Sequence, residues 1–317
     1  MKLILILAMA LGAVAQAKVV DTNQLNAILK AQNAGWTAKT NTLNEMDVAD
    51  FKRMLGVPGQ QDEAVLFEMP KSEKLSAFPA RLDWRNNNGN WVSPILDQGN
   101  CGSCVAFASV AVLETQYKIA SGFAGFNIKL SPQHLFSCGG AYCDFGWYPE
   151  SAAKFIQTKG VPDESCMPYI AGATGQDVAC SATCVDAPRR AVKIQNYSSP
   201  TRRALDLDAL RSALQKGPLM TTLGVYADFV AYAGGVYKHV TGARRGGHAI
   251  SIVGYDDNLR ALIIRNSWGK GWGEDGFGYV SYDDVSGVGT ATWAFDMPSL
   301  NGGVSVENPI DYTYSSG

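Results

Sequence analysis

The sequence predicts an α+β fold in which a helical lobe packs against a lobe of strands. Helical runs dominate the chain before Pro218, and short apolar segments between turn residues dominate the part that follows. Helices and strands that are segregated along a chain are typical of the α+β class rather than of alternating βαβ units. A cleft between two lobes is a natural place for an active site.

The size and charge of the chain limit the classes of function. Its 317 residues, 46% of them hydrophobic, suffice for one large or two modest domains. The formal net charge is -2, and no basic run stands out. Nothing therefore indicates a nucleic-acid partner or a polybasic membrane patch.

The N-terminus has the pattern of an export signal. Lys2 precedes an apolar run over residues 3–14, and Ala15-Gln-Ala17 forms a small-x-small cleavage site. A membrane anchor is the alternative, but the run is shorter than the roughly 20 residues that span a bilayer. We expect residues 1–17 to be a signal peptide. The mature protein is then soluble, without a membrane anchor, and secreted, periplasmic or held in a lysosome-like vesicle.

Residues 18 to about 57 carry a helical pattern. The apolar positions at helical spacing are Leu25, Ile28, Leu29, Ala34, Val48, Phe51 and Leu55. Gly56, Pro58 and Gly59 end the pattern, and a polar stretch over 60–76 has the character of a linker. Behind a signal peptide this layout is typical of a pro-segment, which we place at residues 18–77. An ordinary N-terminal subdomain is the alternative.

The main domain is expected at residues 78–300, followed by a poorly ordered tail over 301–317. A turn at 86–90 precedes the first helix of this domain. Helices are predicted at 105–119, from Ser131-Pro132 onward, at 149–158 and at 206–214. Short strands are predicted at 219–225, 235–237, 249–255, 261–265 and 278–282.

The stretch Gln98-Gly-Asn-Cys-Gly-Ser-Cys104 contains the strongest chemical signal in the chain. Cys104 lies at the first turn of the helix predicted at 105–119. Unpaired amides and a partial positive charge at a helix N-terminus favour a thiolate and lower the pKa of a thiol. Cys104 is therefore the candidate nucleophile. The side chain of Gln98 and the backbone amide of Cys104 are candidate donors to an oxyanion.

His248 is the candidate partner of the thiol. Two glycines precede it, which permits close backbone approach, and a predicted strand follows. The side-chain carbonyl of Asn266 can hold the other ring nitrogen, so that the imidazole works as an acid and base. Trp268 can cover that hydrogen bond. For His134 and His239, the two other histidines, we expect a solvent-facing or packing role.

These residues, in this order, resemble the papain-like cysteine peptidases, in particular the cathepsin B branch. Other segments match the family in family order: Leu130-Ser-Pro-Gln-His-Leu, Gly217-Pro, Val225-Tyr-Ala-Asp-Phe, Gly235-Val-Tyr, Gly246-Gly-His-Ala-Ile and Asn266-Ser-Trp-Gly-Lys-Gly-Trp-Gly-Glu. Residues 20–56 are similar to the short cathepsin B type of pro-segment. The resemblance implies a two-lobe fold, with a helical left lobe, a β-barrel-like right lobe and the active-site cleft between them.

The resemblance also implies roles for individual residues and no cofactor. Cys104 is the implied nucleophile, His248 the acid and base, Asn266 the residue that orients it, and Gln98 the oxyanion donor. The implied substrate-binding residues are Gly146 as a backbone contact for an extended peptide, Trp268 as a wall on the leaving-group side, and Thr222, Gly247 and Ala249 in the second specificity pocket. Phe145 is instead a departure from the family: Asp144-Phe-Gly146 stands where the family often has Asn-Gly-Gly, and we expect Phe145 to narrow or reshape the non-primed cleft.

The seven cysteines fit an oxidising compartment, and an odd number leaves at least one thiol free or paired with another chain. Zinc is the competing use, since Cys101 and Cys104 have finger-like spacing, but the other Cys and His residues form no second compact pair of matching type. Cys180 and Cys184 could serve as that pair, yet exported chains favour disulfides. We expect no metal. The residues alone do not select a pairing. The family pattern implies Cys101–Cys143, Cys138–Cys180 and Cys166–Cys184, with Cys104 free.

Two further departures from the family pattern bear on activity. Val105 replaces the aromatic residue that usually follows the nucleophile, which we interpret as a packing change under the helix. The segment between Cys166 and Cys180 is short and lacks histidine, so the occluding loop that makes cathepsin B a carboxydipeptidase is not visible.

We therefore predict a cysteine endopeptidase that cleaves protein or peptide substrates through a Cys104 thioacyl-enzyme. It is made as a precursor inhibited by its own pro-segment, whose linker over 60–76 is expected to cross the cleft. We expect the mature protein to be a monomer. A catalytically silent peptide-binding protein on the same fold is the alternative, kept open by Val105. A transglutaminase-like enzyme fits the pro-segment and the Gly-His-Ala context less well.

Overall fold

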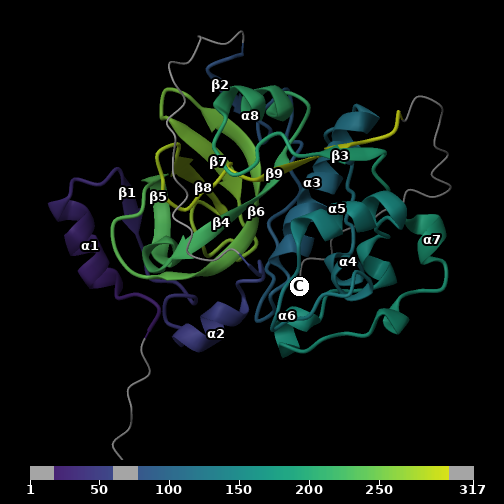
Figure 1. Cartoon of the computed structure of the whole chain (residues 1–317), viewed down its shortest axis with the longest axis horizontal. Coiled ribbons are helices and arrows are strands. Elements are labelled where there is room, and N and C mark those ends of the chain that lie inside the picture. Colours follow the sequence, from purple (N-terminus) through teal and green to yellow (C-terminus); the bar gives the residue numbers. More distant parts are fainter. Residues whose placement is uncertain (1–17, 60–77, 300–317) are drawn as a thin grey trace, which may run out of the picture.

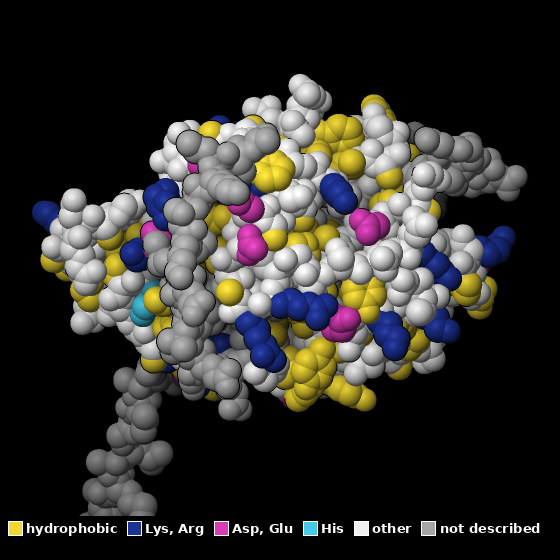
Figure 2. Space-filling model, turned by 45° about the horizontal axis from the view of Figure 1, so that its top comes forward, with side chains coloured by type: hydrophobic (Ala, Val, Ile, Leu, Met, Phe, Trp, Pro, Cys, Tyr) yellow, Lys and Arg dark blue, Asp and Glu magenta, His cyan; other side chains and the backbone are white. Residues whose placement is uncertain are grey.

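The computed structural model describes residues 18–59 and 78–299. The predicted signal peptide, the linker at 60–76, and the tail at 301–317 lie outside these residues. Within the described part, no helix is long and apolar enough to cross a membrane. The face in Figure 2 carries Lys and Arg side chains interspersed with acidic and hydrophobic ones.

The helices are short apart from one that runs through the middle of the molecule (Figure 1). The α-helices are α1 (Thr22–Ala31), α2 (Val48–Arg53), α3 (Cys104–Ser121), α4 (Pro132–Cys138), α5 (Pro149–Thr158), α6 (Ala171–Thr174), α7 (Ala187–Arg190) and α8 (Leu207–Leu214). Single 3-10 turns are η1 (Glu164–Cys166), η2 (Cys180–Ala182) and η3 (Ala227–Ala231). The predicted helices of the main domain match α3, α4, α5 and α8 closely.

The strands form one sheet with an open path. They are β1 (Trp36–Ala38), β2 (Arg81–Asp83), β3 (Asn196–Ser198), β4 (Leu219–Tyr226), β5 (Tyr232–Tyr237), β6 (Arg244–Asp256), β7 (Ala261–Arg265), β8 (Phe277–Ser281) and β9 (Thr292–Asp296). Their order is β1-β5-β8-β7-β6-β4-β9-β3, with β2 paired to β6. The α+β class is therefore confirmed, while the sheet is open rather than closed like the expected barrel.

Helix α3 lies between the sheet and helices α4 and α5 (Figure 1). Strand β6 packs on one side of α3, and α4 and α5 pack on the other. Val105, Val112 and Leu113 are therefore fully buried, and the helix carries apolar residues on nearly every side. Gly122 ends the helix in the left-handed conformation, at φ 69°, and its amide bonds to the carbonyls of the last turn. The first residue of α3, Cys104, thereby lies between the two halves of the molecule.

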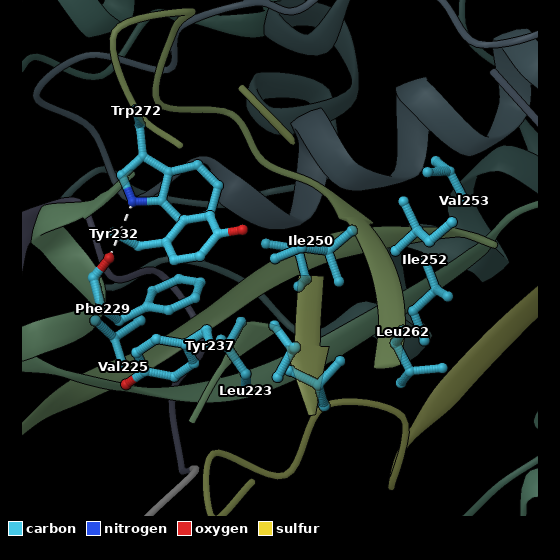
Figure 3. Packing of buried hydrophobic residues seen from close by; sticks show 14 of the residues in the cluster. Leu223, Val225, Phe229, Tyr232, Tyr237, Ile250, Ile252, Val253, Leu262 and Trp272 are labelled. Atoms are coloured by element: carbon cyan, nitrogen blue, oxygen red, sulfur yellow. Dashed lines mark hydrogen bonds between the residues drawn. The ribbon is translucent and has the colours of Figure 1, made fainter. Parts of the chain in front are cut away.

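Two hydrophobic cores lie on the two sides of α3. Figure 3 shows part of the sheet-side core, where the aromatic rings of Phe229, Tyr232, Tyr237 and Trp272 pack beside aliphatic residues of β4, β6 and β7. Trp272 Nε1 donates to the Phe229 carbonyl at 3.0 Å, so the buried indole is satisfied. The second core joins α3, α4 and α5 and takes in residues of β4 and β6, including Ala249 beside the nucleophile.

The segment before the main domain, residues 18–59, packs on the sheet through β1 and reaches the helical side through residues 53–56; we call it the N-terminal segment. It is not helical throughout: α1 ends where Asn33 adopts φ 49°, and β1 then pairs antiparallel with β5, with Trp36 opposite Gly235. The Trp36 indole donates to the Lys238 carbonyl at 2.9 Å and packs on Tyr237. The prediction of helix across this stretch is therefore wrong at β1, because pairing with a distant strand outweighs the local pattern.

Three disulfides hold the helical side together. They are Cys101–Cys143, Cys138–Cys180 and Cys166–Cys184, which is the pairing that the family resemblance implied. Cys104 is the free cysteine of the described chain, and it is buried. The bridge from Cys101 ties the loop in front of α3 to the 138–148 region, and so fixes the backbone from which Cys104 projects.

Candidate active site

Cys104 begins α3, and its sulfur lies against strand β6. The Ala249 amide donates to Sγ at 3.4 Å, which places the residue next to His248 beside the thiol. The loop before α3 turns at Gly99, where φ is +56°, and a Cβ on Gly99 would overlap the Gly172 carbonyl. Glycine is therefore required for the tight approach of this loop to the segment that carries Gly172.

His248 and Asn266 lie on neighbouring elements, at β6 and at the end of β7. His248 Nε2 and Asn266 Oδ1 are 2.8 Å apart, so the ring nitrogen donates to the side-chain carbonyl. The Trp268 ring stacks on the imidazole at 4.5 Å and covers this hydrogen bond, as the sequence predicted. His248 Nδ1 is buried with no hydrogen-bond partner among the described residues, which leaves it as the nitrogen available to the thiol.

Burial sets the charge of the pair in this closed form. Burial raises the pKa of the Cys104 thiol to about 11, although the amides of Ala249 and Gly56 oppose the rise. Burial also lowers the pKa of His248 to about 4, against the bond to Asn266, which favours the charged ring. A neutral thiol thus faces a neutral imidazole. The expected lowering of the thiol pKa by the helix N-terminus is wrong for this form, since loss of solvent outweighs the amide donors.

Gln98 is fully buried and has its side-chain amide held in one orientation. Its Oε1 accepts from the Ser267 hydroxyl at 2.8 Å. Its Nε2 donates to the carbonyls of Met54 at 2.8 Å and Cys101 at 2.9 Å. The backbone amide of Gln98 also donates to the Ser267 carbonyl at 2.9 Å, which ties the loop to the Asn266 region. The Met54 carbonyl, from the N-terminal segment, therefore accepts a hydrogen bond from the Gln98 side-chain amide. That amide is a preorganised donor of the kind that binds an oxyanion.

Residues 54–57 of the N-terminal segment cross the site. The Trp147 amide donates to the Gly56 carbonyl at 2.9 Å, and the Val57 amide donates to the Gly247 carbonyl at 3.1 Å. A Cβ on Gly56 would overlap the Gly102 carbonyl, and one on Gly146 would overlap Gly56 itself. The crossing therefore lies directly after α2, before the 60–76 linker from which the block was expected and which is outside the described residues.

The implied substrate-binding residues fall into two groups. Gly146 and Gly247 contact the crossing segment, and Thr222 pairs with Ala249 across β4 and β6 beside the thiol. Trp268 is buried between the His248 ring and the Phe51 ring of α2. Phe145 differs from these residues, because it is 55% exposed and its ring contacts Tyr148 edge-on. The structure brings the first group to the site and leaves Phe145 at the surface.

The other two histidines have packing roles, as expected. His134 lies against the Phe155 ring, and burial lowers its pKa. His239 stacks on Tyr226 and bonds to the buried Asp228 carboxylate at 3.0 Å. Val105, the residue that departs from the family pattern, is fully buried in the helical core, which supports its interpretation as a packing change.

Some residues of the site carry no signal in the sequence. Ser267 fixes the Gln98 side chain, and Tyr169 donates to the Gln98 carbonyl at 2.6 Å. Arg53 of α2 forms an ion pair with Asp144 at 2.9 Å at the edge of the crossing segment. Their contacts join residues 71 to 169 positions apart, so no local pattern marks them. For Ser267 the only hint is its place next to Asn266.

Comparison with known proteins agrees with this geometry. The model of the papain family of cysteine proteases matches residues 78–296. The chain is 34% identical to cathepsin B-like CP3 of Giardia intestinalis over 289 residues, which cover 87% of this chain and 92% of that protein. The solved structure of procathepsin B S9 from Trypanosoma congolense superposes with a TM-score of 0.71, at 24% identity, over 88% of this chain and 99% of that chain. Procathepsin L 3 of Tenebrio molitor gives a TM-score of 0.69, at 26% identity, over 87% and 88%. The chain belongs to the papain family of cysteine proteases.

Proposed function

We propose that the protein is a cysteine endopeptidase made as an inhibited precursor. Cys104 is the nucleophile that attacks the substrate carbonyl and forms a thioacyl-enzyme, and His248 takes the thiol proton and passes it to the leaving amine. Asn266 holds the imidazole with Nδ1 free for this transfer. Water then hydrolyses the thioacyl bond with His248 as the base.

One observation carries the proposal: the donor geometry of Gln98 around a carbonyl oxygen. Gln98 Nε2 is 2.8 Å from the Met54 carbonyl, with its own oxygen anchored on Ser267. A substrate carbonyl in the place of Met54 would meet a donor that needs no reorganisation as negative charge develops.

The described segment between Cys166 and Cys180 supports cleavage within chains. It contains the single-turn helix α6 and no histidine that could bind a substrate carboxylate. The hydroxyl of Tyr169 and the backbone of Gly172 instead face the Gln98 loop. This segment therefore packs against the Gln98 loop, and it carries no histidine that could bind the carboxylate of a C-terminal dipeptide.

The N-terminal segment supports inhibition of the precursor. It takes the Gln98 donor, contacts Gly247 and leaves the Cys104 sulfur fully buried. Removal of residues 18–59 from the site is then required before a substrate can reach the thiol. The three disulfides fit an exported protein that folds in an oxidising compartment.

A thiol-directed epoxide probe tests the activity. We expect the probe to label Cys104 in the trimmed protein and to label the full chain far more slowly. Cys104→Ala should abolish labelling, and Val105→Ala, which keeps the thiol, should not. The trimmed protein should cleave peptides blocked at both ends. Failure to label would favour a silent binding protein, and release of only C-terminal dipeptides would refute endopeptidase action.

A further inference from the structure

Tyr169 lies between the disulfide cysteines Cys166 and Cys180, outside the residues given a catalytic role. Its hydroxyl sits between the two ends of the loop that runs from Gln98 to Cys104. Tyr169 Oη donates to the Gln98 carbonyl at 2.6 Å, and it lies 2.7 Å from the Ser103 hydroxyl. One side chain thus contacts the residue of the proposed oxyanion donor and the residue before the nucleophile.

The protons of this group can be assigned. A phenol carries one proton, and a carbonyl can only accept, so the Tyr169 proton goes to Gln98. The Ser103 hydroxyl must then donate to Tyr169, because its other acceptor, the Cys101 carbonyl, is 3.5 Å away. The Ser103 hydroxyl thus donates to the Tyr169 hydroxyl, which donates to the Gln98 carbonyl. These two hydrogen bonds connect the two ends of the loop.

Ser103 is an unusual helix N-cap for this reason. Ser131 and Asp206, the N-caps of α4 and α8, have ψ values of 106° and 101°, and their side chains accept a first-turn amide. Ser103 has ψ 12° and makes no such bond. Since its hydroxyl is directed to Tyr169, the first-turn amides of α3 stay available to the sulfur. Burial raises the pKa of the Cys104 thiol, and the amides of Cys104 and Val105 are among those that oppose this rise.

The Tyr169 side chain is itself held firmly. Its amide donates to the Glu164 carboxylate at 3.0 Å, and its ring packs edge-on against Phe107 of α3 at 4.7 Å. Burial raises the pKa of its phenol, so the hydroxyl stays protonated. The next two amides, of Ile170 and Ala171, bond to Gln133. The hydroxyl is therefore fixed from both the backbone and the ring.

We propose that Tyr169 is a positioning residue whose hydroxyl clamps Gln98 to Ser103 and so fixes the oxyanion donor relative to the nucleophile. The proposal rests on the proposed peptidase function. Gln98 acts on charge that develops in the transition state, so loss of the clamp should affect turnover more than ground-state binding.

Tyr169→Phe tests the clamp, because it keeps the ring and removes the hydroxyl. In protein produced as the full chain and then trimmed, we expect kcat to fall about 10-fold with KM changed by less than about twofold. Tyr255→Phe is the matched control: it removes a hydroxyl that donates to the Pro79 carbonyl at 2.8 Å, away from the site. Both variants should lower Tm, and only the first should lower kcat. A normal kcat in Tyr169→Phe, or an equal loss in the control, overturns the proposal.

Ser103→Ala completes a double-mutant cycle. If both hydroxyls act through one clamp, the kcat losses of Tyr169→Phe and Ser103→Ala should combine to less than their product. Fully multiplicative losses would refute a shared role, as would an unchanged kcat in the serine variant.

A readout without turnover separates this proposal from the proposed function. The rate of Cys104 alkylation by iodoacetamide, followed across pH, reports the thiol pKa in the trimmed protein. We expect a higher apparent pKa in Tyr169→Phe, because a freed Ser103 hydroxyl can compete for first-turn amides. Asp97 and Glu164, the acidic groups near the phenol, remain in the variant. An inactive wild type would refute the peptidase function, and an unchanged alkylation profile would refute the clamp.

Discussion

The charge on Cys104 and His248 depends on what covers them. Both are fully buried beneath residues 54–57, and burial moves their pKa values in the directions that keep each group neutral. The hydrogen bonds that favour the charged forms, from Ala249 to the thiol and from the imidazole to Asn266, are already in place. Return of solvent to the cleft is therefore expected to produce the thiolate–imidazolium pair without rearrangement of the scaffold.

Gln98→Ala tests the oxyanion role at the residue scale. Loss of the side-chain amide should reduce kcat about 100- to 1,000-fold with little change in KM, because its donor acts on the charged intermediate. Steady-state kinetics of the trimmed protein measure this change. Gln116→Ala is the control, since Gln116 is also a buried amide but lies on the fourth turn of α3 beside Gly217. Equal losses in the two variants would assign Gln98 to stability rather than to chemistry.

The sequence predicts best those helices and strands whose boundaries are set by neighbouring residues in the chain. Helices α3 and α5 and strand β7 were predictable from apolar periodicity and terminal Gly, Pro or Ser residues. Strand β1 was not, because its partner β5 lies about two hundred residues away and only their pairing makes it a strand. The positions of Gln98, His248 and Asn266 followed from motifs. Tyr169 and Met54 could not, since their importance lies in long-range contacts with Gln98.

Gly56→Ala tests the crossing element after α2. A Cβ at this position would overlap the Gly102 carbonyl, so the segment should lift from the site. We expect iodoacetamide to alkylate Cys104 in the full chain at least about 10-fold faster, the equivalent of about 1.4 kcal/mol of lost docking energy. Gly35→Ala is the control on the same segment, because its Cβ would meet nothing within 4 Å. Equal alkylation of Gly56→Ala and wild type would show that residues 54–57 do not protect the thiol.

At the scale of the whole molecule, the N-terminal segment spans both halves. It adds β1 to the sheet, packs Phe51 against Trp268 and pairs Arg53 with Asp144 on the helical side. The exposed ion pair contributes at most about 1 kcal/mol, so strand pairing and aromatic packing hold the segment more strongly. Because the same segment buries His248, the stability of the closed form is linked to the protonation of that ring.

The linkage predicts that acid destabilises the closed chain. His248 has a pKa of about 4 when closed and an ordinary value of 6.5, so between these values the unfolded chain binds a proton that the closed chain does not. Stability contributed by the neutral ring is therefore complete above pH 6.5 and is lost as pH falls toward 4. Urea unfolding of the full chain at pH 7 and pH 5 should show about 2 kcal/mol more loss in wild type than in His248→Gln, which cannot take up the proton. The buried carboxyls also titrate, but they are the same in both chains, so their contribution to the pH dependence cancels in the comparison. An equal loss in the two chains would mean that the ring is already solvated in the precursor, whereas the expected difference would show that protonation of the buried ring opposes the closed form.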